Sequence, residues 1–225
     1  MKLQDLIEAP QIVSHNQSKF ADFEEEKQNK KFIQKLGLAK GRFNKAGKIP
    51  QYKKWMVIKE IDNYHKLYRS LEGIRGTFVV KDEVSNTIEA YHKVKPFDKS
   101  RLLRIENAVE TFKSWRKETG SPNLKGIISD IIFDYIIPDY HCVATHMEHT
   151  EANRALWWRY IIPRSITEHH LYAGDLSSPR YLIKIDSQKD LKSKLYDEMW
   201  GKKPRFKSKR FIISDKPLKE FKERG

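Results

Sequence analysis

The sequence has little of several residue types, and each shortage excludes a class of protein. Cys142 is its one cysteine, so no intramolecular disulfide can form, and such sparse cysteine usage is typical of a reducing cytoplasm. Ten glycines and nine prolines are too few for a collagen-like or low-complexity chain. No apolar run approaches the roughly 18 residues of a membrane-spanning helix, and Met1–Asp5 lacks the apolar core of a signal peptide. We therefore expect a cytoplasmic protein without a membrane segment.

What the sequence does have is an excess of positive charge, concentrated in two segments. The chain of 225 residues carries a formal net charge of +14 at pH 7. Residues 27–54 contain ten Lys or Arg and no acid, and residues 201–225 contain ten Lys or Arg and three acids. The other 172 residues sum to −3, so the chain is a nearly neutral body with two basic segments.

The basic segments are candidates for contact with nucleic acid or with an acidic host protein. Basic side chains neutralise phosphates, and aromatic rings can stack on bases; the first segment interleaves its lysines with Phe32, Phe43, Tyr52 and Trp55. The alternative is a solvated surface that only keeps the protein soluble. No named recognition motif is present, so no base preference follows. The candidate nucleic-acid-binding residues are Lys30, Lys31, Arg42, Lys53, Lys54, Lys207, Lys209 and Arg210.

The first third of the chain is expected to be partly helical. Apolar residues at helical spacing predict helix within residues 1–26 and an amphipathic helix over residues 55–72. Between them, Gly37, Gly41, Gly47 and Pro50 interrupt regular structure, so residues 27–54 are predicted to form a projecting or poorly packed basic arm. The predicted domains are residues 1–75, which include this arm, and residues 76–225, which end in the basic tail.

The rest of the chain alternates between strand and helix signals, and no internal repeat is evident. Two β-prone runs predict a hairpin, and Pro138 is expected to end one helix and Thr150 to cap another. The order predicts an α/β (α+β) fold, a mixed and mainly antiparallel sheet flanked by helices. The expected strands are 77–80, 88–94, 102–115, 141–145, 170–173, 180–185 and 209–214, and the expected helices are 125–137, 151–162 and 190–200. The alternation over 102–115 is imperfect, so a bulge or a partly helical segment is the alternative there.

This order of elements resembles the GNAT superfamily of N-acetyltransferases. In that family a strand leads into a loop of the type Gln/Arg-x-x-Gly-x-Gly/Ala, whose amides hold the pyrophosphate of acetyl-coenzyme A. The matching stretch here is Asn123-Leu124-Lys125-Gly126-Ile127-Ile128, in which Gly126 fits the pattern while Asn123 and Ile128 depart from it. The resemblance implies acetyl-CoA as cofactor, bound by Asn123, Lys125, Gly126 and Ile127.

A second GNAT-like piece is the pattern Asn-x-x-Ala-x-x-x-Tyr on a helix. It corresponds to Asn153 through Tyr160, with Leu156 in place of the alanine. The resemblance implies that Asn153 lies near the cofactor and that Tyr160 is a general acid for the leaving thiolate. Seven residues make two α-helical turns, so both side chains are expected on one side. The alternative is that Tyr160 is an ordinary residue of an amphipathic helix.

The second half also looks like small accessory proteins of tailed bacteriophages. The resemblance covers roughly residues 75–218 and rests on Thr150, Leu156-Trp157, Leu171-Tyr172 and Met199-Trp200-Gly201. It implies a phage origin, and hence the host cytoplasm, with a GNAT-like core and no established activity.

Other chemistry-bearing residues were weighed against structural roles. Glu106 and Glu110 lie on the expected central strand, where carboxylates serve as general bases in some GNAT enzymes; Glu110 is the candidate. Cys142, inside a buried strand, is expected to be an inert core residue. The cluster His141, Cys142, His146, Glu148 and His149 lacks a known zinc spacing, so no metal is expected.

Two hypotheses of different classes follow. The first is an acyl-CoA-dependent N-acyltransferase, and the second is an inactive GNAT-like protein that binds nucleic acid or a host protein through its basic segments. The acyl acceptor and the oligomeric state do not follow from the sequence.

Overall fold

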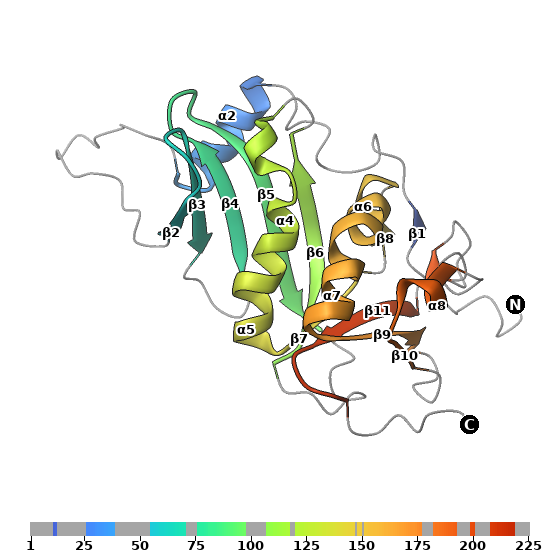
Figure 1. Ribbon diagram of the computed structural model, residues 1–225. Coiled ribbons are helices and arrows are strands. Elements are labelled where there is room, and N and C mark those ends of the chain that lie inside the picture. The colour runs from blue at the N-terminus through green and yellow to red at the C-terminus, as the bar shows by residue number, and fades with distance from the viewer. Residues whose placement is uncertain are drawn as a thin grey trace, which may run out of the picture. The chain divides into compact units, whose positions relative to one another are not determined.

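The chain forms two compact units. The structure is a computed structural model (Figure 1), and it describes residues 11–12, 26–38, 55–70, 76–97, 107–117, 120–146, 148–149, 151–176, 182–192, 199–200 and 208–218. The first unit comprises Met1–Ser18, Lys95–Phe112 and Ser129–Gly225, and the second unit comprises Lys19–Val94 and Lys113–Ile128. Strands β5 (Thr87–Pro96) and β6 (Val109–Arg116) contribute residues to both units.

The secondary structure confirms the predicted class at a coarse level, since mostly antiparallel strands are accompanied by a few helices. The two units do not divide at residue 75, and the predicted domains stay a prediction. Among the residues that the structure describes, no helix is long and apolar enough to span a membrane.

The second unit is built on an antiparallel series of strands with one helix. Its members are α2 (Glu26–Lys35), β2 (Trp55–Glu60), β3 (His65–Ser70), β4 (Thr77–Asp82) and the greater part of β5. Each strand pairs antiparallel with the next, so the predicted β4–β5 hairpin is confirmed. Its core consists of Ile33, Leu38, Tyr68, Val79, Ile88, Tyr91 and Trp115.

The predicted helix over residues 55–72 is wrong, because residues 55–70 form the β2–β3 hairpin. Two members of the supposed apolar stripe are exposed, Met56 at 45% and Tyr64 at 57%. The chain reverses at Asp62, whose Oδ1 accepts hydrogen bonds from the backbone amides of Tyr64 and His65 at 2.9 and 2.8 Å. An aspartate that caps its own turn in this way competes with helix formation.

The basic arm predicted over residues 27–54 also differs in its first part. Residues 26–35 form helix α2, and Asn29, Ile33 and Leu38 are buried. The first glycine of the segment, Gly37, has φ +74° and follows the helix, where a left-handed glycine is common. Residues 39–54 lie outside the described part of the chain.

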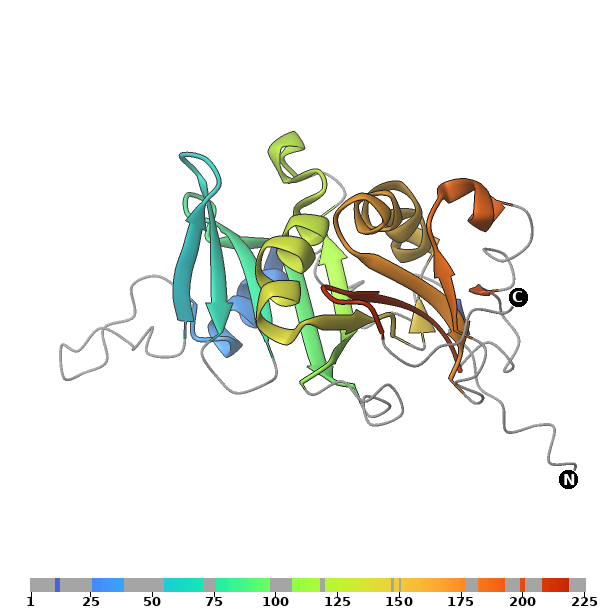
Figure 2. The same cartoon turned by 60° about the horizontal axis from the view of Figure 1, so that its bottom comes forward.

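The first unit contains a parallel strand pair. β6 runs parallel to β7 (Cys142–Ala144), with Val109 opposite Val143 and Glu110 opposite Ala144. β11 (Lys209–Ser214), the last strand of the sequence, lies between β7 and β9 (His170–Asp175) and is antiparallel to both, as Figure 2 shows. β10 (Ile183–Ile185) pairs antiparallel with β9. The positions of β7, β9 and β11 agree with the prediction, whereas β6 begins at Val109 and the first residues of the strand predicted over 102–115 lie outside the described part of the chain. The core of this unit includes Phe97, Cys142, Tyr172 and Ile212.

Two helical segments continue beyond the residues at which they were predicted to end. One consists of α4 (Ile127–Ile131), the π-helical turn η4 (Ile132–Ile136) and α5 (Ile137–Tyr140). The other consists of α6 (Glu151–Leu156), the π-helical turn η5 (Trp157–Ile161) and α7 (Ile162–Glu168).

Each of these segments carries the tetrapeptide Tyr-Ile-Ile-Pro, at residues 135–138 and 160–163, a short repeat that the sequence reading missed. In each, the proline is the second residue after the π turn. A proline lacks the amide that continues an α-helical ladder, and π turns are known to relieve such interruptions. The helix therefore continues past Pro138. The pattern of its backbone hydrogen bonds changes at the π turn that comes before the proline.

The remaining elements are short. β1 (Gln11–Ile12) pairs in parallel with β8 (Glu148–His149). The 3₁₀ turn η3 (Pro122–Leu124) precedes α4. α8 (Gln188–Lys192) begins two residues before the predicted helix 190–200, and residues 193–198 lie outside the described part. Thr150, the predicted cap, lies outside it as well.

Candidate functional site

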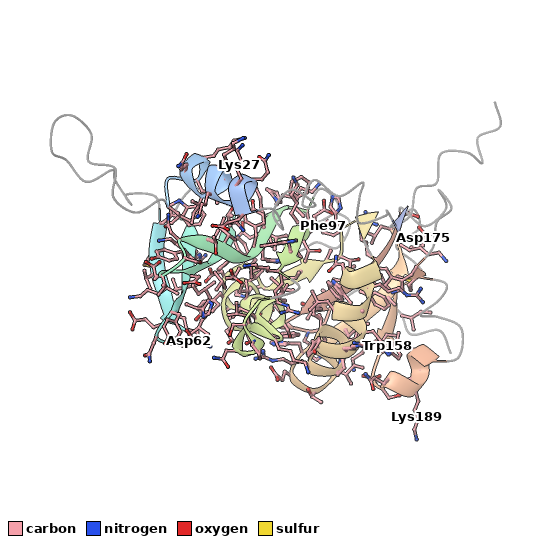
Figure 3. The ribbon with its side chains drawn as sticks, turned by 90° about the horizontal axis from the view of Figure 1, so that it is seen from above. Lys27, Asp62, Phe97, Trp158, Asp175 and Lys189 are labelled. Atoms are coloured by element: carbon pink, nitrogen blue, oxygen red, sulfur yellow. The ribbon has the colours of Figure 1, made fainter. Side chains whose placement is uncertain are left out.

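Helix α2 carries four exposed lysines, and three of them lie on the side opposite its buried residues. Asn29 and Ile33 face the core, and Phe32 packs edge-to-face on Tyr91 with ring centroids 5.7 Å apart. Figure 3 labels Lys27, whose side chain points away from the strands of the second unit. The exposed lysines of the helix are Lys27, Lys30, Lys31 and Lys35, and we call them the lysine face.

The members of the lysine face differ in their surroundings. Lys30 forms an ion pair with Glu26 one turn earlier, and this hydrogen bond lowers the pKa of the Glu26 carboxyl. Lys27, Lys31 and Lys35 recur at intervals of four residues, so at 1.5 Å per residue they rise about 6 Å from one to the next along a helix. Three positive charges are therefore held in line on one side of α2.

The helix is fixed firmly to the second unit. The side chain of Asn29 donates to the carbonyl of Ile88 at 2.8 Å and accepts from the amide of Ile88 at 2.7 Å. Trp55 Nε1 donates to the carbonyl of Leu36 at 2.9 Å, just after the helix. Phe32 and Trp55, two of the rings that were candidates for stacking on bases, pack against the core.

The other predicted nucleic-acid residues fall into two groups. In the first unit, Lys209 is half-buried, and Arg210 is only 6% exposed and donates from Nη1 to the carbonyl of Lys209 at 2.9 Å. A side chain this little exposed is not placed for contact with nucleic acid, so the prediction that Arg210 binds it is not supported by its burial. Arg42, Lys53, Lys54 and Lys207 lie outside the described residues.

The loop that resembles the GNAT cofactor loop lies in the second unit and is closed on itself. Ser121 accepts at Oγ from the amide of Asn123 at 3.3 Å and at its carbonyl from the amide of Leu124 at 3.0 Å. The amide of Lys125 donates to the carbonyl of Pro122 at 3.0 Å. The side-chain amide of Asn123 donates to Asp62 Oδ2 at 3.0 Å.

These residues do not fit the pyrophosphate of acetyl-CoA. Three successive amides of the loop have acceptors within it, and the side chain of Asn123 has a carboxylate as its partner. Gly126 has φ +85°, a conformation that itself favours glycine, Ile127 is buried, and Lys125 is exposed. We therefore derive no step through this cofactor.

The candidate base, Glu110, is buried on β6 in the first unit, with 3% exposure. Its carboxylate forms an ion pair with Lys95 Nζ at 2.6 Å, and this ammonium also lies 5.1 Å from the centroid of the Phe112 ring. The ring of His146 meets Phe112 edge-on at 5.4 Å, and the amide of His146 donates to Thr111 Oγ1 at 3.1 Å. A carboxylate, an ammonium, an imidazole and an aromatic ring thus gather where the beginning of β6 lies beside the end of β7.

Asn153 and Tyr160 are half-buried on the second helical segment of the first unit. Asn153 belongs to α6 and Tyr160 to the π turn η5. The π turn interrupts the α-helical repeat between them, so the expectation that both lie on one side, which assumed an unbroken α-helix, stays a prediction.

The predicted absence of a metal rests on the cluster around β7. Cys142 is buried, and burial raises the pKa of its thiol to about 12. His141 is exposed and pairs with Asp215 at 2.7 Å. Within the described ranges, no group of three His, Cys, Asp or Glu side chains is arranged to hold a metal ion.

Some of these residues were missed by sequence reasoning. Lys27 and Lys35 were assigned to an irregular arm, although their four-residue spacing around Phe32 and Ile33 is a helical signal. Asp62 and Lys95 were missed because their partners, Asn123 and Glu110, are 61 and 15 positions away.

Comparison with known proteins adds no relative: no family model, no curated protein and no solved structure matches the chain.

Proposed function

We propose that the protein binds nucleic acid through the lysine face of α2, on a scaffold of GNAT-like topology. The observation that carries the proposal is the alignment of Lys27, Lys31 and Lys35 on a helix that Asn29 anchors to β5. Lysines on a fixed helix lose less conformational entropy when they bind a phosphate backbone than lysines on a flexible segment do.

The contact is expected to be with phosphates. Phe32 and Trp55 are engaged in the core of the second unit and do not offer a stacking surface for bases. Phosphate contacts position a protein on nucleic acid without reading its sequence. The net charge of +14 adds attraction over a longer range.

The proposal of a GNAT-like topology rests on the order of helices and strands along the chain and in the sheet. β6 leads through a helical segment to the parallel strand β7, a second helical segment leads to β9, and β11 lies between β7 and β9. This order supports the resemblance stated from the sequence.

The test compares two variants with equal loss of charge. We expect the triple variant Lys27→Ala, Lys31→Ala, Lys35→Ala to bind a labelled DNA duplex at least tenfold more weakly at low salt, because three phosphate contacts are lost. The matched control replaces three exposed lysines on other elements, Lys59, Lys189 and Lys216. Fluorescence anisotropy measures both, and equal weakening of the two variants would contradict a specific role for α2.

Acyl transfer is the second candidate, favoured by the buried Glu110 near the beginning of β6, where its carboxylate pairs with Lys95. In that function Glu110 would take a proton from the amine acceptor. Release of free thiol from acetyl-CoA in the presence of amines tests it.

A further inference from the structure

We infer that the Ser121–Gly126 loop is a structural anchor held by Asp62 and that it binds no pyrophosphate. This inference is independent of the lysine face, which shares no residue with the loop. It concerns the one segment that the resemblance to GNAT enzymes assigns to the cofactor.

Three successive backbone donors of the loop already have acceptors inside it. The amides of Asn123, Leu124 and Lys125 bond to Ser121 and Pro122. An anion-binding loop needs amides that point outward without acceptors. Opening this turn to receive a phosphate would cost the three internal hydrogen bonds.

The second step is the charge that faces Asn123. The hydrogen bond from Asn123 is the main cause that lowers the pKa of Asp62, so this carboxylate is ionised at neutral pH. The amides of Tyr64 and His65 and the imidazole Nδ1 of His65, at 2.9 Å from Oδ1, also hold it in place. A phosphate oxygen that sought the side chain of Asn123 would approach a fixed negative charge, which repels it.

The third step is that the other matches to the family loop have local explanations. Gly126 is required by its φ of +85°, whether or not a ligand approaches. The side chain of Ile127 is buried, so an apolar residue at this position contributes to the packing of the core.

The first experiment titrates the wild-type protein with acetyl-CoA in a calorimeter. We expect no saturable heat up to about 1 mM, the weak end of useful affinities. Saturable binding that inorganic pyrophosphate displaces and that Asn123→Ala weakens would overturn the inference. Saturable binding that neither change affects would place the cofactor away from the loop and support it.

The second experiment tests the anchor by thermal unfolding. Asn123→Ala is expected to lower Tm by about 2–4 °C, the shift that corresponds to one lost hydrogen bond in a chain of this size. In the Asp62→Ala background the same change should lower Tm no further, because the partner is already absent. Lys125→Ala, at an exposed neighbouring position, is the control and should leave Tm unchanged.

The outcome for Asn123 alone decides the second experiment, even if Asp62→Ala does not fold. A Tm of Asn123→Ala equal to that of Lys125→Ala would show that the bond to Asp62 stabilises nothing, and the inference would fall.

Discussion

His92 shows at the scale of one residue how burial changes the chemistry of a side chain. It is fully buried on β5, and its Nδ1 lies 2.8 Å from Ser114 Oγ. Burial lowers the pKa of this imidazole from 6.5 to about 3. The imidazole of His92 is therefore neutral in the folded protein at neutral pH.

This burial makes stability depend on pH. Between about pH 6.5 and pH 3 the unfolded chain binds a proton at His92 and the folded chain does not, so stability falls as the pH falls through this range. We expect His92 to account for a loss of about 2 kcal/mol in the free energy of unfolding between about pH 7.5 and pH 5. Urea denaturation at the two pH values measures it.

His92→Gln is the matching variant, since glutamine keeps a polar group near Ser114 and does not titrate. The difference between the two pH values should shrink by about 2 kcal/mol in this variant relative to the wild type. An unchanged difference would show that His92 is protonated in the folded state.

Helix α2 is the element whose attachment matters most for the proposed function. Both hydrogen-bonding groups of the Ile88 backbone are satisfied by Asn29, at a site where Ile88 is 1% exposed. Asn29→Ala leaves a buried amide and a buried carbonyl without these partners. We expect the free energy of unfolding to fall by about 2–3 kcal/mol, as measured by chemical denaturation.

Gln34→Ala provides the control for α2, because Gln34 is exposed on the same helix. Its effect should stay within about 0.5 kcal/mol. A comparably small effect of Asn29→Ala would mean that α2 is held by its apolar residues alone.

The elements also show which signals in the sequence were sufficient. Strands with apolar residues on both faces, such as Cys142–Ala144 and Lys209–Ser214, were found because little else fits a short apolar run between polar segments. The spacing of apolar residues in the β2–β3 hairpin predicts a helix, because these residues happen to recur at helical intervals. The turn that makes the segment a hairpin depends on hydrogen bonds to the side chain of Asp62, which the apolar spacing does not reveal. Helix α2 was hidden because lysines and glutamine dominate it, and two buried residues, Asn29 and Ile33, are enough to fix it.

The candidate sites were predictable to a smaller extent than the strands. Glu110 was selected from its strand, but its pairing with Lys95 depends on two strands meeting. The Asp62–Asn123 hydrogen bond joins two turns that are far apart in the sequence, and spacing within either turn gives no sign of it. Such contacts are set by tertiary structure, which local patterns do not encode.

At the scale of the whole molecule, the charge distribution sets how binding should respond to salt. The net charge of +14 attracts any polyanion, but only phosphates in contact with lysines release counterions on binding. If Lys27, Lys31 and Lys35 each contact one phosphate of a duplex, they contribute about −2.7 to the slope of log K against log salt. Their contribution to affinity should then fall about 40-fold between roughly 50 and roughly 200 mM salt.

The triple lysine variant isolates this contribution. For this variant, the slope of log K against log salt should be shallower than that of the wild type by about 2.7. For the control variant, in which Lys59, Lys189 and Lys216 are replaced, the slope should differ from that of the wild type by no more than about 0.9, the contribution of one phosphate contact. Both proteins lose the same formal charge, so a slope that changes equally in both would assign the binding to the overall field of the molecule. A change confined to the α2 variant would assign it to direct contacts, because a diffuse field does not distinguish three lysines on one helix from three on separate elements.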